Sequence, residues 1–316
     1  MPSLTVVVPA YNESEGLAAF HARLAPVLDG LGLDCSVLYI DDGSRDDTWA
    51  VMRALRDADA RVSLLRLSRN FGKELALTAG LDHVDSDAAV VIDADLQDPP
   101  ELIPDFVAHW QDGCDVVYGT RASRAGETGF KKATASGFYR LMERLSSTPI
   151  PRDTGDFRLL SRRALDALAR VRERQRFMKG LFAWVGFRQQ AVRYDRDPRH
   201  AGQSKWNYWR LWNFAIEGIT SFSNAPLKVA TYVGVLSALL AFLFGLWVLG
   251  KALWFGDPVR GYPSLMVVVL FLGGLQLMAL GVIGEYLGRL YVEAKQRPLY
   301  LVDEYIPAGR APGDAS

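Results

Sequence analysis

The chain has 316 residues, 49% of them apolar and 23% charged, with 36 Lys and Arg residues against 36 Asp and Glu residues. This length favours one large domain with added elements over two independent enzymatic domains. The balanced charge excludes the global positive field that draws a protein to nucleic acid, so no nucleic-acid partner is expected and any anion site must be local. Two isolated cysteines and four scattered histidines indicate neither a zinc site nor a disulfide framework.

Apolar runs and helical spacing alternate along the first part of the chain. Residues 4–8 are a β-branched apolar run that predicts a buried strand. Residues 15–28 have helical spacing, and Asn12 and Glu15 are placed three apart, as in a capping box. The same alternation of strand and helix signals continues at residues 36–40, 62–67, 71–84 and 88–92. The pattern predicts βαβ units and an α/β fold with a mostly parallel sheet.

Polar segments directly follow three of the predicted strands. They are PAYNE from Pro9, DDGS from Asp41 and DAD from Asp93. In parallel sheets ligands bind beyond the carboxyl ends of the strands, so these segments are expected to converge on one rim. The sequence contains neither the G-x-G-x-x-G of a dinucleotide site nor the Gly-rich run ending in Gly-Lys-Ser/Thr of an NTPase after these strands.

Asp93 and Asp95 are one residue apart, so their side chains share a face in an extended segment, and Gln97 follows two residues later. Two carboxylates and an amide oxygen form a hard ligand set that suits Mg²⁺ or Mn²⁺ rather than zinc. A bare Asp-x-Asp is often a solvated turn. Its position after a buried strand favours a metal and diphosphate site here.

Tyr11 offers an aromatic face and Asp42 a carboxylate acceptor, which together could hold a nucleobase. With the carboxylate pair, four segments carry a specific pattern: VVVPAYNE, YIDDGSRDDT, RNFGKELALTAGL and VIDADLQDPPEL. This pattern resembles the family 2 glycosyltransferases of GT-A fold. Within them it is similar to the polyisoprenyl-phosphate hexosyltransferases, the group that contains dolichol-phosphate mannose synthase and bacterial polyprenyl-phosphate glucosyltransferases. The resemblance spans residues 4–205.

The resemblance implies a role for each side chain at the expected rim. It assigns the nucleoside to residues around the ends of the first two strands, namely Pro9, Tyr11, Glu13, Ile40 and Asp42. It assigns Mg²⁺ or Mn²⁺ and the diphosphate to Asp93, Asp95 and Gln97, with Lys73 and Ala94 as further substrate-binding residues.

Cations farther along the chain are expected near the phosphates. Arg121, in YGTR, resembles the family's phosphate-binding arginine, and RHAGQSK resembles its R-x-x-G-x-S-K element, which implies that Arg199 and Lys205 lie near the donor and acceptor phosphates. Fixed cations stabilise the charge that develops during group transfer. Lys131 and Lys132 are further candidates for holding the acceptor phosphate, with a solvated helix face as the alternative.

Asp156, in DTGDFRLLSR, resembles the family's acidic active-site residue, so the catalytic set is expected to be Asp95, Arg121 and Asp156. Asp156 could orient acceptor or sugar, or act as a base. A lipid monophosphate is already largely ionised at neutral pH, which favours orientation. The alternative is a structural role, in which Asp156 pairs with Arg158 or caps a helix that starts near Ser161.

Two late stretches, residues 229–250 and 263–284, carry no charge. At about 1.5 Å rise per residue each is long enough to cross a hydrocarbon core of about 30 Å, which predicts two transmembrane helices rather than two buried core helices. The Trp-rich residues 206–227 predict an amphipathic interfacial helix. No cleaved signal peptide is expected, and the basic flanks predict a multi-pass protein of the inner (cytoplasmic) membrane with a cytosolic catalytic domain.

The expected organisation has four parts: a cytosolic GT-A catalytic domain (1–203), an interfacial helix region (204–227), a two-helix transmembrane domain (228–288) and a cytosolic C-terminal tail (289–316). The resemblance implies inverting, metal-dependent transfer of a hexose, with UDP-glucose as first candidate, onto polyprenyl phosphate for cell-envelope or O-antigen glycosylation. Glycines in the expected spans favour a dimer or tetramer.

Two other functions fit parts of the sequence. A processive polysaccharide synthase would use a Q-x-x-R-W element, whereas this chain has Gln190 to Tyr194, QAVRY, in an alternating stretch that predicts a strand. A non-enzymatic membrane scaffold would need neither the metal nor the carboxylate pair.

Overall fold

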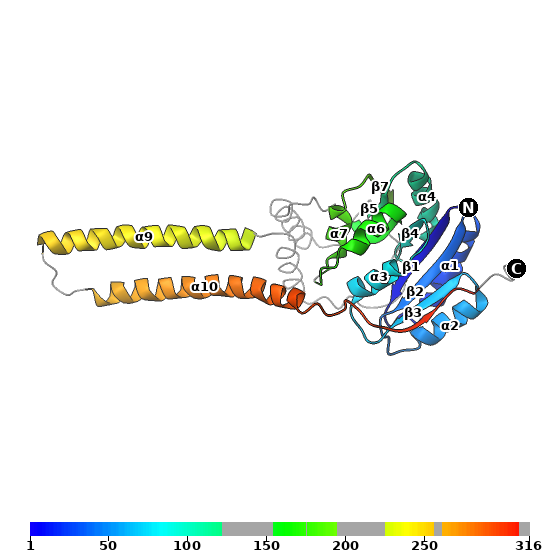
Figure 1. Cartoon of the computed structure of the whole chain (residues 1–316), viewed down its shortest axis with the longest axis horizontal. Helices are drawn as coiled ribbons and strands as arrows, with labels where there is room; N and C mark the ends of the chain where they lie inside the picture. The colour runs from blue at the N-terminus through cyan, green and yellow to red at the C-terminus, as the bar shows by residue number, and fades with distance from the viewer. Residues whose placement is uncertain (122–153, 175, 195–224, 256–260, 310–316) are drawn as a thin grey trace. The chain divides into compact units, whose positions relative to one another are not determined.

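The computed structural model describes residues 1–121, 154–174, 176–194, 225–255 and 261–309 (Figure 1). The chain divides into two compact units. The first contains the sheet and its helices together with the residues from Arg297 onward, and the second contains two long helices.

The described part of the first unit is built on an eight-stranded sheet with the order β7-β5-β6-β4-β1-β2-β3-β8. The strands are β1 (Ser3–Ala10), β2 (Asp34–Asp41), β3 (Val62–Leu67), β4 (Ala88–Val91), β5 (Val116–Arg121), β6 (Thr154–Ser161), β7 (Gln189–Tyr194) and β8 (Val302–Ile306). β1 pairs in parallel with β2 and β4, β2 with β3, and β5 with β7, whereas β6 is antiparallel to β4 and β5. The expected α/β fold with a mostly parallel sheet is confirmed.

Helices follow the strands in the expected alternation. They are α1 (Leu17–Asp29), α2 (Thr48–Ala58), α3 (Lys73–Asp82), the 3₁₀ turn η1 (Pro100–Leu102), α4 (Ile103–Gln111), α6 (Arg162–Arg170) and α7 (Met178–Trp184). The capping box expected at the start of α1 is wrong. Asn12 has a positive φ of 56°, its side-chain oxygen accepts a hydrogen bond from the Arg45 amide, and α1 starts after Gly16 without a side-chain cap.

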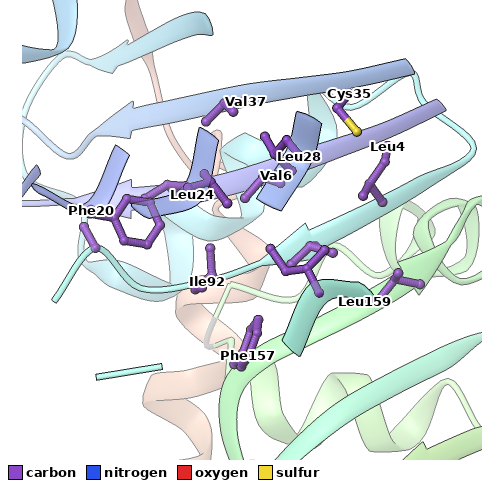
Figure 2. Close-up of a cluster of buried hydrophobic side chains, with 14 of the residues drawn as sticks. Leu4, Val6, Phe20, Leu24, Leu28, Cys35, Val37, Ile92, Phe157 and Leu159 are labelled. Atoms are coloured by element: carbon purple, nitrogen blue, oxygen red, sulfur yellow. The ribbon is translucent and has the colours of Figure 1, made fainter. Parts of the chain in front are cut away.

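The apolar core explains why the sequence of β1 is an almost continuous run of hydrophobic residues. Val6 and Val8 belong to the cluster that also contains Phe20 of α1 and Phe157 of β6 (Figure 2 labels Val6, Phe20 and Phe157). Val7 faces α3 instead, because a Cβ added to Gly80 would lie 2.6 Å from its Cγ1 atom. Both faces of the strand are therefore buried, as in the centre of parallel sheets, and Gly80 lets α3 approach closely.

The chain returns to the sheet after the second unit and adds β8 along the edge of β3 in antiparallel orientation. The Ser68 amide donates to the Leu301 carbonyl at 2.9 Å, and Glu304 of β8 forms an ion pair with Arg53 at 2.7 Å. The Tyr300 hydroxyl donates to Asp82 at the end of α3, 2.9 Å away. β8, part of the stretch 289–316 that was expected only as a tail, thus covers a sheet edge that would otherwise have unpaired backbone groups.

The second unit contains α9 (Ala225–Phe255) and α10 (Tyr262–Ala294), which contact each other and expose many large apolar side chains. Among the described residues, one helical segment, Phe271–Ala294 of α10, is long and apolar enough to cross a membrane. The apolar segment of α9, Ala230–Phe244, is shorter. A span in α9 therefore stays a prediction, as does the interfacial helix of residues 206–227, most of which lies outside the described residues.

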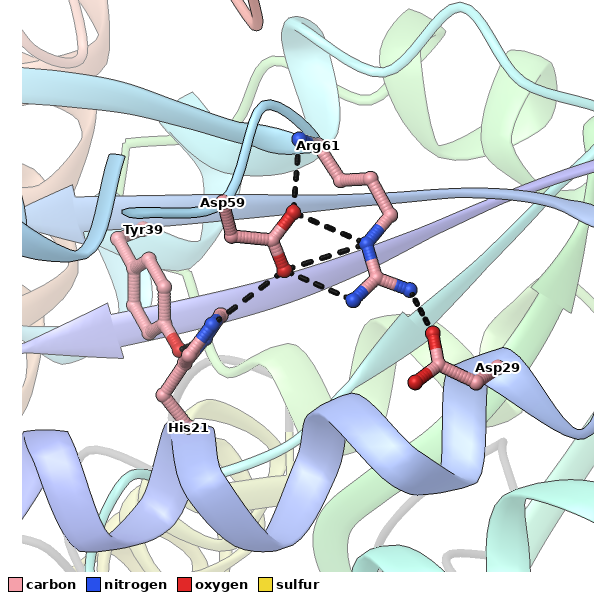
Figure 3. A network of polar contacts seen from close by, with 5 residues as sticks. All are labelled: His21, Asp29, Tyr39, Asp59 and Arg61. Carbon is pink, nitrogen blue, oxygen red and sulfur yellow. Dashed lines mark hydrogen bonds and ion pairs between the residues drawn. The ribbon is translucent and has the colours of Figure 1, made fainter. Parts of the chain in front are cut away.

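A buried polar network joins α1, β2 and the start of β3 (Figure 3). His21 Nδ1 lies 2.9 Å from the Tyr39 hydroxyl and His21 Nε2 lies 3.4 Å from Asp59 Oδ2. Arg61 pairs with both Asp59 and Asp29. Burial lowers the pKa of His21 below its ordinary value of 6.5, although Asp59 acts in the opposite direction.

This network predicts a loss of stability in mild acid. Because the folded protein disfavours protonated His21, the unfolded chain takes up this proton more readily, and stability falls as the pH drops below about 6.5. We expect the melting temperature of the detergent-purified protein to fall between pH 7.5 and pH 5.5, and less so in His21→Gln, which cannot titrate. An equal fall in both proteins would contradict this assignment.

Candidate active site

A cavity of about 270 Å³ opens at the carboxyl ends of β1, β2 and β4, beside the start of α3. Its lining comes from four separate segments of the chain: Pro9, Ala10, Tyr11 and Glu13; Asp42; Asn70, Gly72, Lys73 and Ala76; and Asp93, Ala94 and Asp95. This is the edge at which parallel sheets bind ligands. The three polar segments therefore converge at one edge of the sheet, as expected.

Backbone donors fix the segment after β1. The Asn12 amide donates to the Ser44 hydroxyl at 3.0 Å, and the Glu13 amide donates to the Thr48 hydroxyl at 2.9 Å. Tyr11, between this anchored turn and β1, remains 40% exposed at the cavity. An aromatic face on a fixed turn is suited to stacking against a flat ring.

Asp42 is buried and organises the loop that precedes α3. Its two carboxylate oxygens accept hydrogen bonds from the amides of Phe71 at 2.7 Å and Gly72 at 2.9 Å. Burial raises its pKa above the ordinary value, and the two amide bonds act against this rise. Gly43 lets this loop approach closely, since a Cβ there would lie 2.5 Å from the Arg69 carbonyl carbon. Asp42 thereby also sets the position of the first residue of α3, Lys73.

Lys73 joins two acidic side chains from different strands. Its ammonium lies 2.7 Å from Asp93 Oδ2 and 2.6 Å from Asp156 Oδ2 on β6. Burial alone would lower the pKa of Lys73, but the two carboxylates raise it above its usual value. Burial would raise the pKa of Asp156, but Lys73 and Lys179 outweigh it and hold this pKa at about 2. Lys73 is therefore a fixed cation and Asp156 a fixed anion at neutral pH.

Three further charged side chains interact with Asp156, of which Arg158 is buried and Glu74 and Lys179 are partly buried. Burial raises the pKa of Glu74 to about 7, with Asp156 as the next contribution, and Glu74 Oε2 accepts a hydrogen bond from the Met178 amide at 3.1 Å. Burial lowers the pKa of Lys179 on α7 and lowers that of Arg158 to about 10. Arg158 donates to the Gly155 carbonyl at 2.8 Å and lies over the Phe182 ring. These charges set the electrostatic environment of Asp156.

The turn after β4 carries the carboxylate pair. Asp95 Oδ1 accepts a hydrogen bond from the Gln97 amide at 3.1 Å, and Leu96 has a positive φ of 59°. Asp93 Oδ1 is buried without a hydrogen-bond partner, beside a cavity that Asp95 also lines. A hard cation would satisfy this oxygen, so the two carboxylates fit Mg²⁺ or Mn²⁺. Within the described ranges no group of three or more His, Cys, Asp or Glu side chains forms a metal cluster.

The structure brings most of the expected site residues together and places others apart. Expected residues at the cavity are Pro9, Tyr11, Glu13, Asp42, Lys73, Asp93, Ala94 and Asp95, with Asp156 joined to them through Lys73. Ile40 is fully buried beneath Gly80 of α3, and Gln97 does not line the cavity. Arg121 is the last residue of β5, and Lys131, Lys132, Arg199 and Lys205 lie outside the described residues.

The structure does not show Asp156 forming an ion pair with Arg158 or capping the helix that starts near Ser161. Arg158 bonds to backbone carbonyls, including that of Asp156 at 3.3 Å, and it is Ser161 that caps α6 by accepting from the Ala164 amide. The pentapeptide from Gln190 to Tyr194 lies in β7, as its alternation predicts. The sequence did not indicate that Glu74 and Lys179 lie near Asp156. That proximity depends on the packing of α7 against β6, which nothing local to residues 178–184 predicts.

Residues 5–169 match the model of glycosyl transferase family 2, and residues 225–290 match that of the GtrB C-terminal hairpin. The chain belongs to glycosyltransferase family 2 and carries its GT-A fold. It is thus an enzyme and not a scaffold.

Three relatives cover almost the whole chain. An uncharacterized glycosyltransferase of Synechocystis sp. is 51% identical over 309 residues, covering 96% of this chain and 97% of that protein. The bactoprenol glucosyl transferase of Shigella phage SfV is 46% identical over 299 residues, covering 95% and 97%. A prophage bactoprenol glucosyl transferase homolog of Escherichia coli is 44% identical over 299 residues, covering 95% and 98%.

Proposed function

We propose that this glycosyltransferase moves a hexose from a nucleotide diphosphate sugar onto polyprenyl phosphate, with inversion at the anomeric carbon. The observation that carries the proposal is the joining of Asp93 and Asp156 through Lys73 at a cavity that also holds Tyr11 and Asp42. These residues support a nucleoside site, a metal site and a charged transfer site at one edge of the sheet. The relatives named bactoprenol glucosyl transferase support the lipid acceptor and favour glucose as the sugar.

The donor side of the cavity suits a uridine nucleotide. Tyr11 supplies the stacking surface, and the carboxylate of Asp42 can accept from an imide N–H in addition to the amides of residues 71 and 72. Pro9, Glu13 and Ala94 shape the same cavity. UDP-glucose is therefore our first candidate donor.

Asp93 and Asp95 would hold Mg²⁺ or Mn²⁺ against the diphosphate, with Gln97 as a third proposed ligand. Such an ion neutralises the negative charge that builds up on the leaving nucleotide. Lys73 pairs with one oxygen of Asp93, and the other oxygen, buried without a hydrogen-bond partner, would bind the cation. Arg121, Arg199 and Lys205 are proposed to contact the phosphates, and Lys131 and Lys132 are further proposed contacts.

The acceptor needs positioning more than activation. A lipid monophosphate has a second pKa near 6, so it is largely an anion at neutral pH. Asp156, with a pKa of about 2, is too weak a base to add much, and we assign it the orientation of the sugar or the acceptor. Lys73 fixes the direction of Asp156.

The lipid acceptor places the reaction at a membrane. The apolar segment Phe271–Ala294 and the match to a C-terminal hairpin support two spans that hold the catalytic unit at the cytosolic face of the inner membrane. Glycines in α9 and α10, including Gly234, Gly273 and Gly274, support self-association as a dimer or tetramer.

The proposal is tested by incubating the purified protein with polyprenyl phosphate, Mg²⁺ or Mn²⁺, and a panel of labelled nucleotide sugars. We expect label from UDP-glucose in the organic phase, as a product of one sugar per lipid. Polymeric product would favour a processive synthase, and labelling by a different sugar would correct the donor.

A further inference from the structure

A buried tyrosine on β7 reaches the turn that carries the carboxylate pair. The Tyr194 hydroxyl donates to Asp98 Oδ1 at 2.5 Å. Tyr194 is 6% exposed and Asp98 1%. Asp98 directly follows the segment Asp93–Gln97 in the chain. Neither Tyr194 nor Asp98 lines the cavity.

The ring of Tyr194 is held in place by its neighbours. On β5, a Cβ added to Gly119 would lie 2.7 Å from Cε1 of Tyr194, so the ring occupies space that only glycine leaves open. Phe157 of β6 meets the ring edge-on, with centroids 6.1 Å apart and planes at 90°. Phe157 in turn packs on Phe106 of α4. With the ring fixed by two strands, the hydroxyl has a fixed direction toward Asp98.

The turn combines an internal hydrogen bond with an unusual backbone conformation. The Gln97 amide donates to Asp95, Lys73 pairs with Asp93, and Leu96 adopts a left-handed conformation that non-glycine residues rarely use. Such backbone conformations persist only where surrounding contacts enforce them. The hydrogen bond from Tyr194 to Asp98 supplies a contact from outside the turn, three residues beyond Asp95.

We propose that Tyr194 is a positioning residue for the metal- and diphosphate-binding turn. It touches neither substrate nor metal, and acts by anchoring Asp98 so that Asp93 and Asp95 face the cavity together. The inference rests on the proposed function in its use of a divalent ion.

The test is Tyr194→Phe in the full-length protein, which keeps the ring and its packing and removes only the hydroxyl. We expect the affinity for Mn²⁺ in the presence of UDP, measured by the electron paramagnetic resonance signal of free Mn²⁺, to fall about tenfold, as when a hydrogen bond to a charged group is lost. The KM for the nucleotide sugar should rise with it.

The matched control is Tyr39→Phe, which removes another buried tyrosine hydroxyl, bonded to His21 on the α1 side of the sheet (Figure 3). It should lower the melting temperature and leave Mn²⁺ affinity unchanged. Asp98→Asn keeps an acceptor for Tyr194 and should retain most of the affinity. Asp98→Ala should lose it, with no further loss when combined with Tyr194→Phe.

Wild-type Mn²⁺ affinity in Tyr194→Phe, alongside a loss in Asp93→Asn, would overturn the inference. So would equal losses in Tyr194→Phe and Tyr39→Phe, since that is the result of general destabilisation. Failure of the wild type to bind Mn²⁺ would overturn it as well. If the wild type binds Mn²⁺ but transfers no sugar to polyprenyl phosphate, the proposed function fails and the Mn²⁺ measurements still decide the role of Tyr194.

Discussion

Asp93→Asn and Asp95→Asn are each expected to reduce sugar transfer by about a thousandfold. Either change removes one negative charge from a site where a divalent ion would offset charge on the leaving group, an effect worth several kcal/mol. A rise of about 4 kcal/mol in the activation barrier lowers the rate by about three powers of ten. Initial rates at saturating donor and lipid, over a range of Mn²⁺ concentrations, measure the effect.

The control is Asp57→Asn on the exposed face of α2, which makes the same chemical change away from the cavity. It should keep the wild-type rate. A rate within tenfold of wild type for either Asp93→Asn or Asp95→Asn, in a folded protein, would exclude the pair as the metal site.

Lys73→Met is expected to reduce the rate about a hundredfold and to change its pH dependence. Removal of the ammonium leaves Asp93 and Asp156 without their shared cation. Because Lys73 lowers the pKa of Asp156, its loss raises this pKa, and Asp156 becomes protonated at a higher pH. The acid limb of the rate profile should therefore move toward neutral pH.

Lys73→Arg keeps the charge and should keep the acid limb near its wild-type position, even if the larger guanidinium lowers the rate. Asp156→Asn cannot titrate, and with it the shift caused by Lys73→Met should disappear. An unchanged profile in Lys73→Met would show that the ion pair does not set the ionisation of Asp156.

The elements around the cavity could be predicted because each has a local signal. The apolar run of β1, the strand signals of β2 to β4 and the polar segments after them are visible within a few residues. The rule that ligands bind at the carboxyl ends of parallel strands then joins Tyr11, Asp42 and Asp93 without knowledge of their contacts. The strand β7 was equally visible, from the alternation of Gln189–Tyr194.

The remaining features depend on contacts between distant residues. The antiparallel insertion of β6 between β4 and β5 has no local signature, because a buried strand reads the same in either direction. β8 is a short, exposed edge strand whose sequence carries little alternation of apolar residues. Asp42 was expected as an acceptor for a nucleobase N–H, and its bonds to the amides of residues 71 and 72 could not be foreseen because they require the folded loop. The predicted capping box does not form, because the Asn12 side chain accepts a hydrogen bond from the distant Arg45 amide instead.

Transfer from labelled UDP-glucose to polyprenyl phosphate, with and without chelator, tests the central claim most directly. With Mn²⁺ present, we expect label to enter the organic phase in proportion to enzyme, to drop to background in excess EDTA, and to return when Mn²⁺ exceeds the chelator. Full transfer in excess EDTA, or no lipid labelling by any nucleotide sugar, would contradict a metal-dependent polyprenyl-phosphate glycosyltransferase.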